Sequence, residues 1–158
     1  MQSDCLALAS WRARPRSFVA LMGLYESNFV RLGWLVDLDR RPSGVLHSRV
    51  PGDCELVFSV NCISPHTTMA KMTYRLAGPN PCVETGGHDS PDLELRIYHD
   101  ARLVEAVAWQ GEQGHTVLQR LQRRAERELD QRWARNSMLN KWLEYCSERG
   151  HRLVRAGR

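Results

Sequence analysis

The segment Leu93–Trp109, LELRIYHDARLVEAVAW, decides the fold class of this chain. Apolar residues recur at every second position on both sides of its centre, which is the pattern of half-buried strands. The residues between the two halves, around Tyr98-His99-Asp100-Ala101, are about as many as a tight turn needs, and Asp is favoured in turns. The segment therefore predicts two antiparallel strands joined in a hairpin.

Further alternating stretches precede this hairpin. Residues 54–62 and 70–76 have the pattern of strands, and residues 45–50 form a weaker candidate. No helical crossover separates these stretches, which favours a meander of antiparallel strands, because parallel pairing needs a connection of a dozen or more residues. Cys54 and Cys62 fall on the apolar side of the first stretch, where a thiol usually behaves as a small buried hydrophobic group.

Amphipathic helices are predicted on both sides of the strands. In residues 16–37 the helical stripe consists of Phe18, Leu21, Met22, Tyr25, Phe29, Leu32 and Val36. Near the C-terminus the stripe consists of Leu139, Trp142, Leu143 and Cys146, with Asn136 or Ser137 able to cap the helix start and Gly150 able to end it. The predicted fold is α+β, with an N-terminal helix, an antiparallel sheet of about five strands and a C-terminal helix packed on one face.

Length and composition predict a single globular domain. The chain has 158 residues, of which 42% are hydrophobic and 25% charged. We expect residues 1–15 to be a disordered basic lead-in, residues 16–152 to form the domain, and residues 153–158 to be a basic tail. No apolar run approaches the roughly 20 residues that cross a bilayer, so we expect no membrane contact.

Cysteine and histidine usage points to a reducing compartment and to no bound metal. The five cysteines are odd in number and form no CxxC pair, which favours a cytoplasmic location. The Cys and His residues lack the spacing of zinc fingers, and nothing else in the sequence indicates a cofactor.

Positive charge is concentrated in the C-terminal third. Residues 115–158 contain 11 Lys and Arg against 5 Asp and Glu, whereas the whole chain has a net charge of +4. On a helix, Arg120, Arg123, Arg124 and Arg127 would form a basic stripe. Such a stripe is typical of a solvated helix face, of nucleic-acid contact or of contact with an acidic protein, and nearby acidic residues would neutralise part of it.

His99 and Asp100 are the sharpest candidates for chemistry. An imidazole could serve as general base, with the adjacent carboxylate supplying charge. The alternative is a structural role in the turn, because neighbouring strand residues point to opposite faces and the two side chains need not converge.

Glu26 and Asn28 lie near the apolar stripe of the first helix. If they are buried they need partners, since an unpaired buried carboxylate or amide costs a few kcal/mol. Arg96 and Arg132 are the predicted partners. Such a group would be a structural pair or the floor of a site for an acidic ligand.

Three groups of residues resemble the YqiB-like family, a bacterial domain of unknown function. They are Glu26-x-Asn28-Phe29-x-x-Leu32, Arg96-x-Tyr98-His99-Asp100-Ala101 and Asp130-x-Arg132-x-x-x-Asn136-x-x-Leu139-x-x-Trp142-Leu143-x-x-Cys146. The resemblance covers residues 18–150, and the chain departs from the family pattern in residues 110–129. It implies a cytoplasmic bacterial protein and supplies no reaction, cofactor or catalytic residue.

The favoured hypothesis is a small binding or interaction module for an acidic or nucleotide-like ligand or for a protein partner, with a homo-oligomer left open. Its candidate ligand-binding residues are Glu26, Asn28, Arg96, His99, Asp100 and Arg132. One alternative is an enzyme that acts on a phosphorylated or nucleotide-like substrate through His99 and Asp100. The other is an RNA- or DNA-associated protein that uses the basic stripe.

Overall fold

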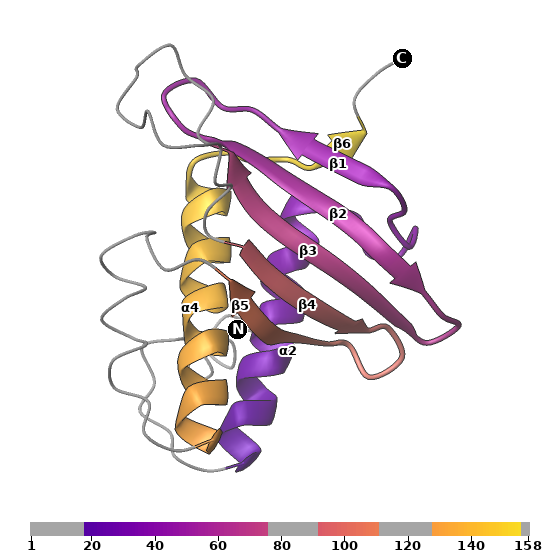
Figure 1. Ribbon diagram of the computed structural model, residues 1–158, viewed down its shortest axis with the longest axis vertical. Coiled ribbons are helices and arrows are strands. Elements are labelled where there is room, and N and C mark those ends of the chain that lie inside the picture. The colour runs from indigo at the N-terminus through magenta and orange to yellow at the C-terminus, as the bar shows by residue number, and fades with distance from the viewer. Residues whose placement is uncertain (1–17, 76–91, 111–127, 156–158) are drawn as a thin grey trace, which may run out of the picture.

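A computed structural model describes residues 18–75, 92–110 and 128–155. In chain order the elements are α2 (Phe18–Leu35), β1 (Val45–Ser48), β2 (Glu55–Ile63), β3 (Thr67–Arg75), β4 (Asp92–Tyr98), β5 (Leu103–Gln110), α4 (Glu128–Glu148) and β6 (Val154–Arg155). The strands form one antiparallel sheet in the order β5-β4-β3-β2-β1-β6 (Figure 1). The predicted fold class is confirmed, with a short sixth strand added.

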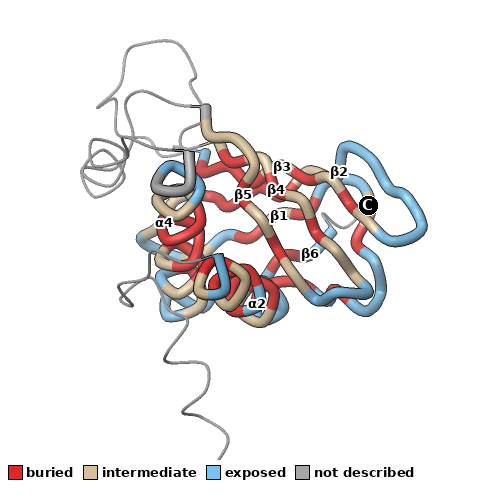
Figure 2. Tube along the Cα trace, turned by 90° about the horizontal axis from the view of Figure 1, so that it is seen from below, coloured by how far each residue is buried: buried red, intermediate tan, exposed pale blue. Residues whose placement is uncertain are grey.

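The two helices lie together against one face of the sheet (Figures 1 and 2). Side chains from β4 that point to this face, Leu93, Leu95 and Ile97, are fully buried, as are Leu139 and Leu143 of α4. Each such side chain contributes about 1.5–3 kcal/mol when it leaves water. The core therefore lies between the sheet and the helix pair, as the two apolar patterns predicted.

The predicted hairpin joins β4 to β5. Leu95 pairs with Ala106 and Ile97 pairs with Val104. At the turn, the Arg102 amide donates to the His99 carbonyl over 3.3 Å. Arg102 has a φ of 54°, a left-handed conformation that is uncommon outside glycine.

The start of α4 differs from the prediction, and its end agrees. The helix includes residues from Glu128 onward, so Asn136 lies in its interior and does not cap it. Gly150, at φ 85°, follows the last turn, where the Gly150 amide donates to the Ser147 carbonyl and the His151 amide to the Cys146 carbonyl, both over 3.0 Å. These two bonds form a Schellman motif and satisfy carbonyl groups that the helix end would leave open.

Some positions of the predicted apolar stripes are exposed. Phe18, at the first turn of α2, is 66% exposed. Cys62 is exposed although it continues the alternation of β2, because the register with β3 shifts between Val60 and Cys62. Cys54 is half-buried and packs against the core, in line with the prediction for that thiol.

The chain end takes part in the sheet. Leu153 is buried, and its amide donates to the Leu35 carbonyl at the end of α2 over 2.8 Å. Val154 and Arg155, which the sequence assigned to a basic tail, then pair with β1. Within the described ranges, no helix has the length and hydropathy that spanning a membrane requires.

The buried thiol of Cys146 supports a prediction about reactivity. Burial raises the pKa of this thiol to about 12, and its Sγ lies 3.2 Å from the Tyr74 hydroxyl. Because the thiolate is the reactive species, we expect iodoacetamide at about pH 8.5 to modify exposed Cys62 at least about a hundredfold faster than Cys146 in the folded protein. Peptide mass spectrometry checks this rate ratio, and unfolding in urea should abolish it. Equal rates in the folded protein would contradict the burial of Cys146.

Candidate functional site

Three buried asparagines join the two helices. Asn28 of α2 and Asn136 and Asn140 of α4 are all fully buried. The Asn28 Nδ2 donates to the Asn136 Oδ1 over 3.3 Å, and the Asn140 Nδ2 donates to the Asn28 Oδ1 over 3.0 Å and to the Ser27 hydroxyl over 2.9 Å. Asn28 is thus buried and paired, but its side-chain partners are amides from α4 and not the predicted Arg96 or Arg132.

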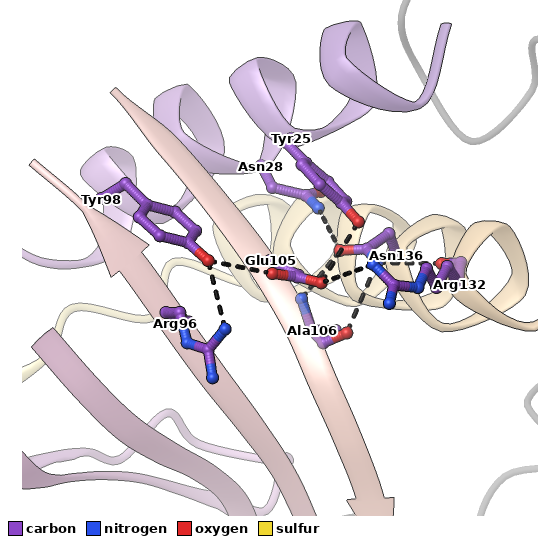
Figure 3. Close-up of polar contacts among 8 residues, drawn as sticks. All are labelled: Tyr25, Asn28, Arg96, Tyr98, Glu105, Ala106, Arg132 and Asn136. Atoms are coloured by element: carbon purple, nitrogen blue, oxygen red, sulfur yellow. Dashed lines mark hydrogen bonds and ion pairs between the residues drawn. The ribbon is translucent and has the colours of Figure 1, made fainter. Parts of the chain in front are cut away.

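Asn136 also pairs with the edge strand β5 (Figure 3). Its Oδ1 accepts from the Ala106 amide over 2.8 Å, and its Nδ2 donates to the Ala106 carbonyl over 3.4 Å and to the Arg132 carbonyl over 2.9 Å. Asn28 Nδ2 similarly donates to the Val104 carbonyl over 3.3 Å. The two carboxamides therefore take the place of a neighbouring strand, which is one way in which proteins protect a sheet edge.

Glu105 of β5 is the centre of a second polar cluster, next to the asparagines (Figure 3). Its carboxylate accepts from the hydroxyls of Tyr25 and Tyr98, both over 3.3 Å, and lies 3.8 Å from the Arg132 guanidinium. Burial, and then the negative charge of Glu105, raise the pKa of Tyr25 to about 12, so this hydroxyl stays protonated. Glu105 therefore links its own strand to α2 and β4 through charge-assisted hydrogen bonds and to α4 through an ion pair.

Arg96 borders this cluster. Its guanidinium donates to the Tyr98 hydroxyl over 3.3 Å and to the Met69 sulfur over 3.4 Å. The structure thus brings three predicted site residues, Asn28, Arg96 and Arg132, into one region around Glu105. Glu26 is exposed on α2 and is not among the residues of this cluster.

His99 and Asp100 lie at the turn between β4 and β5, and their side chains have different partners. The His99 Nε2 lies 2.8 Å from the Thr68 hydroxyl, whereas Asp100 forms an ion pair with His66 of the adjacent hairpin. Burial, and then the positive charge of Arg41, lower the pKa of His99, which favours the neutral imidazole. The pair therefore has the contacts of a turn, and its proposed chemistry stays a prediction.

The predicted basic stripe of Arg120, Arg123, Arg124 and Arg127 lies outside the described residues.

A pocket of about 520 Å³ lies at the carboxyl end of α2. It is bounded by the last turns of this helix and by residues 36–39, which follow the helix. The turn between β4 and β5 and residues 152–154 complete the lining. Its apolar floor consists of Phe29, Leu35, Leu38 and Leu153, which are all buried, and the indole of Trp34 is 41% exposed at its wall. The volume lies in the range of small-molecule sites, and the open lining is about as polar as it is apolar.

Two arginines, Arg102 and Arg152, line the same pocket. The Arg102 guanidinium lies over the Phe29 ring at 4.9 Å from its centroid, and Arg152 Nη1 donates to the Trp34 carbonyl. Within the described parts of the chain, neither guanidinium forms an ion pair with a carboxylate. Both therefore keep N–H groups that could bind an acid.

Ser48, His151 and Asp53 form a buried chain of contacts at the far end of α4. The His151 ring is 1% exposed, with Nδ1 3.0 Å from the Ser48 hydroxyl and Nε2 3.2 Å from an Asp53 carboxylate oxygen. The residue types are those of a hydrolytic triad, but Ser48 is 5% exposed and its Oγ accepts the Arg152 amide over 2.8 Å. The arrangement ties the end of α4 to β1 and to the loop before β2.

The described residues contain no group of three His, Cys, Asp or Glu side chains able to hold a metal ion.

Sequence reasoning missed Glu105, Tyr25, Asn136 and the pocket arginines as site residues. Glu105 falls on the polar side of a strand pattern, and Tyr25 falls on the apolar stripe of a helix pattern. Neither position therefore suggested a functional role. For Arg102 a signal existed, since it stands at the turn where Gly or Asn is the usual choice for a left-handed conformation. No comparable signal marks Arg152.

The comparisons with known proteins give a family. Neither the curated proteins nor the solved structures yielded a match. The family model described as "Protein of unknown function (DUF1249)" matches residues 31–152, which include every described strand except β6 as well as α4 and most of the pocket lining. The chain therefore belongs to this family of proteins of unknown function.

Proposed function

We propose that this protein is a small binding module that takes an acidic ligand in the pocket at the carboxyl end of α2. The observation that carries the proposal is the pairing of an apolar floor with the guanidinium groups of Arg102 and Arg152, neither of which has a carboxylate partner among the described residues. Guanidinium groups bind carboxylates and phosphates through paired N–H donors, and they stack on aromatic rings as Arg102 does on Phe29.

The backbone of Arg102 gives separate support. Its φ of 54° is uncommon for a residue with a Cβ and costs of order 1 kcal/mol, which glycine would avoid. The presence of arginine in this unfavourable conformation at the pocket supports a role of its side chain in ligand binding. The ligand's acid would meet Arg102 and Arg152, and its apolar part would lie on the floor near Phe29.

The proposal is tested by thermal shift and calorimetry with phenyl phosphate and phenylacetate, each compared with a neutral analogue, benzyl alcohol or phenylacetamide. A ligand at 100 times its dissociation constant adds about 2.7 kcal/mol of stability, so the melting temperature should rise by several degrees with the acids only. We expect Arg152→Gln to weaken binding by roughly tenfold or more, because a hydrogen bond to a charged group contributes about 1.5–3 kcal/mol.

Two further variants make this test specific. Arg102→Gly removes the second guanidinium while it suits the left-handed backbone, so it should bind weakly and still fold. Arg75→Gln, at the exposed end of β3, removes the same charge away from the pocket and should bind like the parent. Equal binding of acids and neutral analogues, or full binding by both pocket variants, would contradict the proposal.

The finer family assignment is also a proposal. We infer a YqiB-like bacterial protein that works in the cytoplasm, and support comes from the three quoted motifs, two of which contribute Asn28 and Asn136 to one buried network. Fractionation of cells that express the full chain would test the location. The enzymatic role of His99 and Asp100 and the nucleic-acid role of the basic stripe stay alternatives, and no contact among the described residues favours them.

A further inference from the structure

The pocket at the end of α2 also carries negative charge. Asp39 is one of the residues that line it, is exposed, and has no hydrogen-bond or ion-pair partner among the described residues. Asp37, which lines the same pocket, is already engaged, because it accepts from the Arg40 amide over 3.3 Å and pairs with the Arg40 guanidinium over 3.1 Å. Asp39 is therefore the carboxylate at this site that is open to a ligand.

The carboxyl end of α2 borders the same pocket. Aligned peptide dipoles place roughly half a negative charge at the C-terminus of a helix, where cations bind favourably. The last turn holds no basic residue of its own, but the Arg152 guanidinium donates to its Trp34 carbonyl and already offsets this charge. The Trp34 carbonyl accepts from Arg152 and the Leu35 carbonyl from the Leu153 amide, so the last turn is also fixed in place.

The pocket thus presents cationic and anionic groups next to an apolar floor. Resting on the function proposed above, we propose that the ligand is amphoteric, with an acid and a protonated amine on a small apolar body, as in a free amino acid with an apolar side chain. The carboxylate would bind Arg102 and Arg152, and the ammonium group would meet Asp39. The side chain would lie on the floor that includes Phe29 and Leu153.

A simple acid would satisfy only half of these groups. It would leave the Asp39 carboxylate near its own negative charge, and like charges at such a site disfavour binding. An amphoteric ligand instead offers opposite charge to both sides. A volume of about 520 Å³ lies in the usual range for small-molecule pockets and has room for such a compound.

The test compares L-leucine, L-phenylalanine and L-tryptophan with their N-acetyl derivatives by calorimetry on the full chain. We expect at least one free amino acid to bind about tenfold more tightly than its N-acetyl form, which lacks the ammonium charge. In Asp39→Asn this ratio should fall to about one, while Arg152→Gln should weaken both forms. Glu94→Gln, which removes a carboxylate from the face of β4 opposite the helices and away from the pocket, serves as the matched control and should keep the ratio.

The outcomes separate the two proposals. Equal binding of free and N-acetyl amino acids, or a ratio that survives Asp39→Asn, would overturn the amphoteric ligand and leave the acid-binding module intact. If no free amino acid binds but phenyl phosphate or phenylacetate does, the amphoteric ligand is likewise overturned and the acid-binding module stands. If neither the amino acids nor these acids bind, both proposals fail.

Discussion

Replacing Asn136 with alanine is expected to lower the free energy of unfolding by about 3 to 5 kcal/mol. The variant would leave the amide and the carbonyl of Ala106 without partners and would remove one acceptor from Asn28, all in a fully buried region. Each buried polar group left unsatisfied costs about 1–3 kcal/mol. Urea denaturation measures the loss, and the melting temperature should fall by roughly 10 °C.

Two comparisons make this result specific to the network. Asn61→Ala removes the same amide from an exposed position on β2 and should change stability by less than about 0.5 kcal/mol. Asn28→Ala and Asn136→Ala should lose less together than the sum of their separate effects, because they share one hydrogen bond. A loss for Asn136→Ala no larger than that for Asn61→Ala would show that the network contributes little.

The layer arrangement was predictable because it depends on local periodicity. Alternation places Leu95 and Ile97 on one face of β4 whatever the partner strands are, and a step of three or four residues places Leu139 and Leu143 together. Periodicity is less informative for a polar residue beside an apolar stripe. Glu26 and Asn28 both occupy such positions, yet Glu26 is exposed and Asn28 is fully buried.

The difference between these two residues comes from α4. Asn28 finds its partner in Asn136, which lies 108 positions further along the chain, and no local pattern could reveal that contact. The same holds for the pocket, whose lining combines α2 with Arg102 and Arg152 from distant turns. Core elements follow from sequence spacing, whereas polar networks and pockets depend on tertiary contacts between distant segments.

Replacing His151 with alanine is expected to cost about 2 to 4 kcal/mol of stability. The imidazole is fully enclosed, bonds to Ser48 and Asp53, and lies against the Tyr74 ring at 6.0 Å between centroids. Its removal leaves a cavity and takes one donor from the Asp53 carboxylate, which then has only the Arg149 guanidinium at 3.7 Å among its described ion-pair partners. Urea denaturation of the variant measures the effect.

Two further variants separate the contribution of the His151 hydrogen bonds to stability from the contribution of its packing. His151→Gln keeps a donor for Asp53 and an acceptor for the Ser48 hydroxyl, so it should recover part of the stability that His151→Ala loses. His66→Ala removes an exposed imidazole that pairs with Asp100, and it should change stability by less than about 1 kcal/mol. If His151→Gln is as unstable as His151→Ala, then packing rather than the two hydrogen bonds holds the end of α4 against β1. If His151→Gln is clearly more stable, the Ser48–His151–Asp53 chain acts as a structural tie, which agrees with the burial of the Ser48 hydroxyl.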